Sequence, residues 1–114
     1  MIVVPLNCDR ITDWESFHSF FAEVFGFPDF YGRNMDAWID CMSYLDESES
    51  GMSTINIRTG EVLTLQLDGV DGFAVRCPEQ YAALVEGITI VNLRRSSKGE
   101  EAVLALSFYK HSSS

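Results

Sequence analysis

The chain has 114 residues, a length that fits one domain with a single hydrophobic core. Seventeen acidic residues against eight basic ones give a formal net charge of −9, which argues against direct binding of nucleic acid or of an anionic membrane, since both need clustered lysine and arginine. The balance favours a cationic partner, or it merely keeps the protein soluble. We expect one domain over residues 1–110 and a flexible tail at 111–114.

A strand and a helix are predicted at the start of the chain. Residues 2–6 form a short apolar run rich in β-branched side chains, which indicates a buried strand. Because Pro5 lacks a backbone N–H group, that strand belongs at a sheet edge or ends near the proline. Thr12 and Glu15 then match the two partners of a capping box. They precede aromatic residues at helical spacing, which predict a helix over residues 13–25.

The second helix begins at Asn34, a good N-cap residue, and runs to Tyr44 or Leu45. Asp36 and Asp40 lie four residues apart, so their carboxylates share one face. Like charges so placed cost roughly 0.2–0.5 kcal/mol of helix stability, and an acidic pair flanked by aromatic side chains suits the capture of a cationic group. The competing interpretations are a favourable contact with the helix dipole for Asp36 and a solvated face for Asp40. The apolar stripe contains Met35, Trp38, Ile39, Met42 and Leu45.

The second half of the chain alternates strand and helix signals. Residues 53–67 fit either a hairpin or one strand over 62–67 that is reached by a loose segment, and residues 69–73 are typical of a loop. Pro78 starts a third helix with a buried face that reaches to about residue 91. An apolar run at 102–108 predicts the last strand.

This order of elements predicts a small α/β layer fold. Strands separated by helices pair in parallel through right-handed crossovers. We therefore expect a three-stranded, mainly parallel sheet packed with three to four helices, with room for an extra strand or hairpin at 53–67.

The cysteines Cys8, Cys41 and Cys77 are few and widely spaced. They form neither a CxxC pair nor a zinc-type cluster, so we expect no disulfide framework, no metal site and no cofactor. A reducing cytoplasm is the natural compartment, and the N-terminus has no signal-peptide pattern. Cys41 is predicted to be a core residue, as are Tyr31 and Trp38, whereas His18 and His111 are taken as incidental.

The stretch at residues 27–42 is the most informative part of the sequence. It reads FPDFYGRNMDAWIDCM, a loop bounded by proline and glycine that leads directly into the acidic helix. It resembles the signature of the barstar family, intracellular protein inhibitors of bacterial ribonucleases. The family pattern is Pro-acid-aromatic-Tyr-Gly-x-Asn-Leu-Asp-Ala, then two largely apolar residues and Asp-Cys. The resemblance is specific, because the loop, the helix cap and the acid spacing match together.

The resemblance implies that the loop and helix block a ribonuclease active site by mimicking RNA phosphate. Asp40 matches the phosphate-mimicking aspartate and Asp36 its companion, since a rigid carboxylate can accept charge-assisted hydrogen bonds from the basic residues of such a site. Phe30 matches an aromatic residue that stacks on the enzyme, and Ile39 takes a rim position where the family often has tryptophan. The expected partner-binding residues are Phe30, Gly32, Asn34, Asp36, Ile39 and Asp40.

The resemblance further implies an acid on the last helix, where the chain offers Glu79 and Glu86 early and Arg94 and Arg95 late. The implied partner is a basic ribonuclease or a ribonuclease toxin domain, and the implied protein is a bacterial, cytoplasmic inhibitor or immunity protein, monomeric when free. The alternative is a barstar-fold interaction module with a non-nuclease partner.

An enzyme is the third class of function, with the two aspartates of the acidic helix as a general acid/base pair or as ligands of a divalent cation. The sequence shows no obvious further set of oxygen ligands. It also shows no glycine-rich phosphate loop and no nucleophile motif. We therefore expect no catalytic activity.

Overall fold

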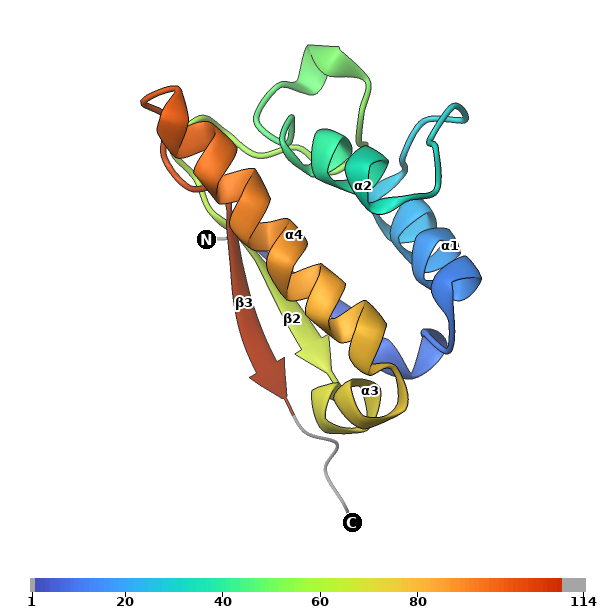
Figure 1. Ribbon diagram of the computed structural model, residues 1–114. Coiled ribbons are helices and arrows are strands. Elements are labelled where there is room, and N and C mark those ends of the chain that lie inside the picture. The colour runs from blue at the N-terminus through green and yellow to red at the C-terminus, as the bar shows by residue number, and fades with distance from the viewer. Residues whose placement is uncertain (1, 110–114) are drawn as a thin grey trace.

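The computed structural model describes residues 2–109 and contains a three-stranded, all-parallel sheet with helices between its strands (Figure 1). This confirms the predicted α/β layer fold, while the predicted tail at 111–114 and His111 lie outside the described residues. The strands are β1 (Ile2–Asn7), β2 (Leu63–Asp68) and β3 (Leu104–Tyr109). The helices are α1 (Trp14–Phe25), α2 (Met35–Met42), α3 (Val70–Arg76) and α4 (Pro78–Ser97), with short 3₁₀ helices η1 (Cys8–Arg10) and η2 (Ser48–Ser50).

One face of the sheet is covered by helices and carries the core. Strand β2 lies between β1 and β3, and its alternate residues Leu63, Leu65 and Leu67 are fully buried, as the apolar alternation predicts. Helix α4 crosses in front of β2 and β3, with α1 and α2 beside it (Figure 1). Strand β1 is an edge strand, so Pro5 stands where the missing N–H group is tolerated.

Helix α1 is capped one residue later than the sequence pattern predicted. The Asp13 side chain accepts a hydrogen bond from the Ser16 N–H at 2.7 Å, and Ser16 Oγ accepts one from the Asp13 N–H at 3.0 Å. The prediction of Thr12 and Glu15 as the capping partners was therefore wrong. Both pairs have the required spacing of three residues, so spacing alone could not distinguish them.

The hairpin allowed at 53–67 does not form, and β2 is the single strand of that segment. The residues before β2 instead hold the C-terminal end of α1, where Ser53 Oγ and the Thr54 N–H both donate to the Phe25 carbonyl at 2.8 Å. Gly26 follows with a φ of 62°, and a Cβ atom there would lie 2.2 Å from Thr54 Oγ1. Glycine is thus required by both conformation and space.

The stretch at 69–73 was predicted to be a loop, yet it begins α3. This helix is short and contains glycine, so its own propensity is weak. Tertiary contacts stabilise it, because Phe73 is fully buried and the Arg76 guanidinium donates to the carbonyl groups of Cys8 at 2.8 Å and Ile11 at 3.0 Å.

Helices α2 and α4 approach closely at Gly87. A Cβ atom at this position would lie 3.0 Å from both Met35 Cε and Trp38 Cζ3. The Trp38 side chain is fully buried, which confirms its predicted place in the core, and its Nε1 group has no hydrogen-bond partner among residues 2–109. A small residue on α4 is therefore what lets the indole ring pack between the two helices.

The substitution Gly87→Val should destabilise the protein, because it adds bulk against a buried ring. We expect the free energy of unfolding to fall by about 2 kcal/mol or more, measured by denaturant titration. Ala82→Val places the same side chain on an exposed position of α4, and should change stability by less than about 0.7 kcal/mol. Equal losses in the two variants would contradict the close packing described here.

Candidate functional site

The loop between α1 and α2 is anchored by a buried pair of polar side chains. Tyr31 Oη lies 2.6 Å from His18 Nδ1, and both residues are buried. Tyr31 is thus a core anchor as predicted, but His18 is not incidental. Burial, with a smaller contribution from the charge of Arg33, lowers the pKa of His18 to about 4. Burial also raises the pKa of Tyr31, so the pair is a neutral hydrogen bond at pH 7.

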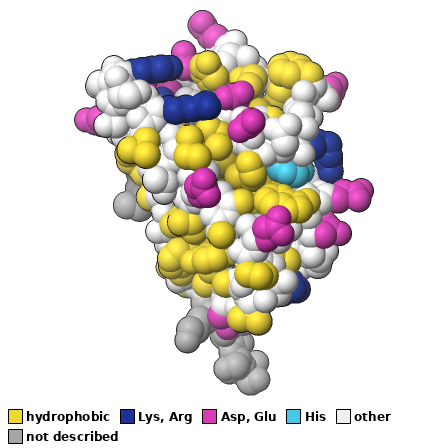
Figure 2. Space-filling model, in the orientation of Figure 1, with side chains coloured by type: hydrophobic (Ala, Val, Ile, Leu, Met, Phe, Trp, Pro, Cys, Tyr) yellow, Lys and Arg dark blue, Asp and Glu magenta, His cyan; other side chains and the backbone are white. Residues whose placement is uncertain are grey.

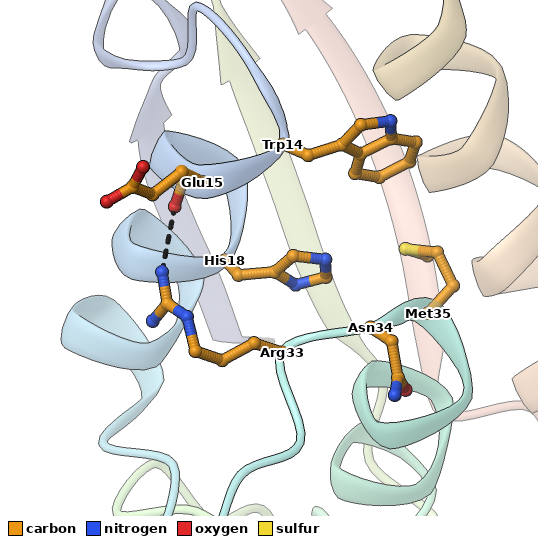
Figure 3. A pocket seen from close by; sticks show the side chains of 6 residues that line it. All are labelled: Trp14, Glu15, His18, Arg33, Asn34 and Met35. Atoms are coloured by element: carbon orange, nitrogen blue, oxygen red, sulfur yellow. Dashed lines mark hydrogen bonds between the residues drawn. The ribbon is translucent and has the colours of Figure 1, made fainter.

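Arg33 turns the chain from the loop into α2. Its φ of 54° lies in the left-handed region, which is uncommon for a residue with a side chain. The guanidinium reaches back to α1 and donates to the Glu15 carbonyl at 3.1 Å and to Ser19 Oγ at 2.8 Å. Figure 3 shows the contact between Arg33 and the Glu15 carbonyl. It lies beside a hollow of about 370 Å³. The hollow is lined by Trp14, Glu15, His18, Arg33, Asn34 and Met35.

Three of the predicted partner-binding residues lie on the loop or at its junction with α2. Phe30 is 76% exposed, so most of its ring is open to contact. Gly32 is exposed and has no positive φ, and an added Cβ would come no closer than 3.4 Å to Ala37 Cβ, so the fold does not require glycine there. Asn34 caps α2 as predicted, because its Oδ1 accepts a hydrogen bond from the Ala37 N–H at 2.8 Å.

The two aspartates of α2 are both exposed but differ in their surroundings. Asp36 has no hydrogen-bond or ion-pair partner among the described residues. Asp40 Oδ1 lies 2.8 Å from Arg94 Nη1, in an ion pair whose side chains are 53% and 49% exposed, respectively. Sequence reasoning did not find this partner. Arg94 was noted only as a basic residue late in the last helix, and nothing local in the sequence indicates which residue it meets.

Ile39 was predicted to belong to the apolar stripe and to lie at the rim beside the acids, and at only 5% exposed it presents no open surface there. It instead contributes to a hollow of about 180 Å³ between α2 and α4, which Asp36 and Glu86 also line. The other early acid of α4, Glu79, accepts a hydrogen bond from Trp14 Nε1 at 3.1 Å. Of these two acids, Glu86 is therefore the one that lies at the hollow between the helices.

This face of the molecule carries acidic side chains among apolar ones. Figure 2 shows basic side chains next to acidic ones over its upper part, where the end of α4 approaches α2, and apolar side chains between the acids below. The face is therefore acidic around Asp36 and of mixed charge around Asp40.

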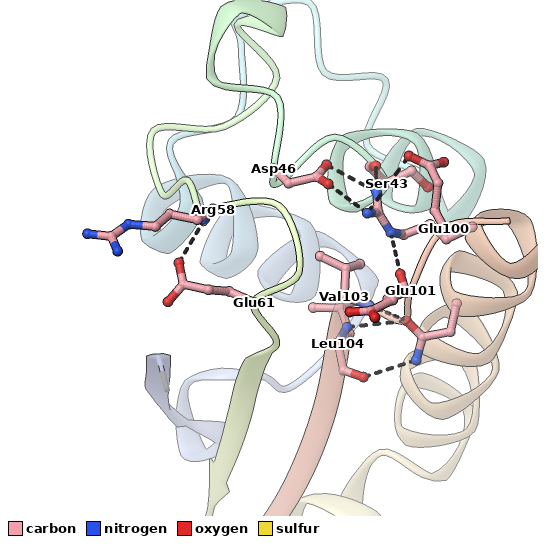
Figure 4. Close-up of polar contacts among 10 residues, drawn as sticks. Ser43, Asp46, Arg58, Glu61, Glu100, Glu101, Val103 and Leu104 are labelled. Atoms are coloured by element: carbon pink, nitrogen blue, oxygen red, sulfur yellow. Dashed lines mark hydrogen bonds and ion pairs between the residues drawn. The ribbon is translucent and has the colours of Figure 1, made fainter. Parts of the chain in front are cut away.

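A buried ion pair connects α4 to the chain just after α2. Arg95 Nη1 and Nη2 donate to the two carboxylate oxygens of Asp46 at 3.0 Å and 2.6 Å, and both side chains are almost fully buried. Arg95 Nε donates to the Glu101 carbonyl at 2.9 Å. Figure 4 shows Ser43 and Asp46, from the segment after α2, and Glu101, from the segment after α4, meeting at this point. The pair therefore fixes how α4 sits against α2.

The two neighbouring ion pairs should differ sharply in their effect on stability. Asp46→Ala removes the carboxylate that makes two bonds to a buried guanidinium, so we expect a loss of about 3–5 kcal/mol in the free energy of unfolding. Asp40→Ala breaks an exposed pair and should cost no more than about 1 kcal/mol. Denaturant unfolding of the two variants tests this, and similar losses would show that burial does not separate the pairs.

The buried histidine should make stability depend on pH. Because the pKa of His18 falls from 6.5 in the unfolded chain to about 4 in the folded protein, the unfolded chain takes up the proton first as pH drops. The contribution of neutral His18 to stability is fully present above pH 6.5. It should be lost as pH falls towards 4, and the free energy of unfolding should then drop by up to about 3 kcal/mol. We expect His18→Gln to show a smaller difference in unfolding free energy between pH 7 and pH 4.5 than wild type. The same difference in both proteins would refute this assignment.

The described residues show little that would support other kinds of site. Within residues 2–109, no three His, Cys, Asp or Glu side chains form a group that could hold a metal ion. No helix in that range is long and apolar enough to cross a membrane. Cys8, Cys41 and Cys77 are buried free thiols, and Cys41 is the core residue that was predicted.

Comparison with known proteins bears on the whole of this site. A family model described as "Barstar (barnase inhibitor)" matches residues 1–107. A search of curated proteins found no match. The matched range includes the loop, both aspartates of α2 and all of α4.

Proposed function

The chain belongs to the barstar family, and on that premise we propose that it binds a basic bacterial ribonuclease and blocks the active site of that enzyme. Members of this family are protein inhibitors rather than enzymes, so the proposed activity is binding without catalysis. The observation that carries the proposal is the exposed edge made by the aromatic loop and α2. There, Phe30, Asp36 and Asp40 all lie at the surface.

The chemistry of this edge suits a site built to hold phosphate. A ribonuclease binds the RNA backbone with cationic side chains, and a carboxylate offered at the same place accepts charge-assisted hydrogen bonds from them. Asp36 is exposed and has no partner among the described residues, so its carboxylate needs no rearrangement to bind. The net charge of −9 adds long-range attraction to a basic enzyme, and salt should weaken that attraction.

The remaining predicted residues have roles that follow from their placement. Phe30 is exposed and would stack on the enzyme surface, while Gly32 would let the partner approach the backbone closely. The Asn34 side chain keeps its capping role, so its backbone is the part left for contact. Ile39 is reached only by a group that enters the hollow between α2 and α4.

The biological setting is part of the same proposal. A producer of a secreted ribonuclease, or of a toxin with a ribonuclease domain, must protect its own RNA. We propose that the protein serves this purpose as a monomeric cytoplasmic inhibitor or immunity protein, and an acidic protein with three free thiols is compatible with a reducing compartment.

A second candidate is a barstar-fold interaction module with a non-nuclease partner. The observation that favours it is the Asp40–Arg94 pair, because the carboxylate expected to mimic phosphate already has a cation beside it. A partner of this second kind would bind with little dependence on Asp36 and Asp40.

The decisive experiment is inhibition of purified basic bacterial ribonucleases, barnase among them, assayed by RNA cleavage. We expect stoichiometric inhibition of at least one enzyme by wild type, and an affinity at least about 100-fold lower for Asp36→Ala/Asp40→Ala, because charge pairs desolvated in an interface contribute several kcal/mol. The control Glu49→Ala/Asp71→Ala removes two other exposed acids and therefore has the same net charge as Asp36→Ala/Asp40→Ala. Added salt should weaken inhibition.

Two results would contradict the proposal in different ways. If wild type inhibits none of the enzymes, the inhibitor function is wrong and the second candidate gains support. If wild type inhibits one but both double variants lose affinity equally, the function holds while the assignment of the site to α2 fails.

A further inference from the structure

We infer that Arg94 is a specificity-determining residue of this surface, because it occupies the Asp40 carboxylate in the free protein. A ribonuclease can use Asp40 as a phosphate mimic only after its own cation has displaced Arg94 or come to lie beside it. Arg94 thereby lowers the affinity for ribonucleases whose groups facing Asp40 are all cationic. The inference rests on the proposed function and names the residue that tunes it.

The geometry of the pair leaves it open to competition. Arg94 reaches Asp40 from α4 across the junction with α2, and a single N–H group joins one carboxylate oxygen at 2.8 Å. Both side chains are about half exposed. A hollow of about 70 Å³ at this junction is also lined by Lys98, Glu47 and Glu100. Water and an incoming cation can therefore reach the same carboxylate that Arg94 holds.

Comparison with the neighbouring Arg95 shows that the fold does not depend on the Arg94–Asp40 pair. The buried Arg95 uses all three guanidinium nitrogens, on two backbone carbonyls and the Asp46 carboxylate, and holds α4 in place. The guanidinium of Arg94 has Asp40 as its partner among the described residues. Removing Arg94 therefore exposes a carboxylate while leaving the packing of α4 intact.

The two ends of the face formed by α2 and α4 consequently differ in how favourably they bind a cation. Around Asp36 and Glu86 two exposed carboxylates line one hollow, and no basic residue within 2–109 lines it with them. Around Asp40 an incoming cation meets the positive charges of Arg94 and Lys98 along with two further acids that line the same hollow. Like charges brought together in an interface lower affinity, and this is how proteins discriminate against related partners. The cation nearest Asp40 is thus the one that this surface disfavours.

The test compares Arg94→Ala with Arg58→Ala, which removes an exposed arginine elsewhere and has the same net charge. The first probe is a hexa-arginine peptide, titrated by calorimetry at low salt. We expect Arg94→Ala to bind it about twofold to fivefold more tightly than Arg58→Ala, the range that corresponds to an exposed ion pair. The second probe is a ribonuclease that wild type inhibits, for which we expect a gain of about tenfold, since the interface excludes water.

Comparing Arg94→Ala with Arg58→Ala in an Asp40→Ala background shows whether the gain in affinity depends on Asp40. We expect the advantage of Arg94→Ala to disappear there. An equal affinity of Arg94→Ala and Arg58→Ala for the peptide, a gain that persists without Asp40, or a loss of ribonuclease inhibition on removing Arg94 would each overturn the inference. If wild type inhibits no ribonuclease, the proposed function fails, and the peptide titration still decides the role of Arg94.

Discussion

The buried ion pair between Arg95 and Asp46 is the contact on which the candidate surface depends. A guanidinium taken out of water is costly, and here the cost is offset by two bonds to one carboxylate and further bonds to backbone carbonyls. This contact joins the C-terminal part of α4 to the chain just after α2. About two turns before it, Gly87 lets α4 approach Trp38. Together they set the spacing between the side chains of the two helices.

Burial gives two adjacent arginines opposite roles. Successive residues on a helix point about 100° apart, so α4 turns Arg95 into the protein and leaves Arg94 at the surface. The buried pair is structural, since both side chains are almost fully removed from water and two bonds join them. The exposed pair is weak and exchangeable, so it adds little to stability and has its effect when a partner arrives. A face that is mostly acidic thereby acquires one site of mixed charge.

Local features of the sequence were predictable and non-local ones were not. The cap at Asn34, the buried place of Trp38 and the shared face of Asp36 and Asp40 follow from spacing within one helix, and the structure bears them out. The Asp40–Arg94 contact spans 54 residues, and no periodicity indicates it. Helix α3 escaped prediction because tertiary contacts override its weak propensity, and the hollow at Ile39 depends on how closely α4 packs against α2.

The parallel pairing of the sheet also determines when this surface can exist during synthesis. Ile2 pairs with Leu63, and the partner of Asp46 lies 49 residues further along the chain. A ribosome adds roughly 5–20 residues per second, so the acidic helix emerges several seconds before the helix that positions it. The sheet can close only after the last strand, β3, has been synthesised, because β3 pairs with β2. A protein of this topology gains a complete binding face only after α4 has been synthesised, so a product truncated before α4 would carry the acidic motif without its support.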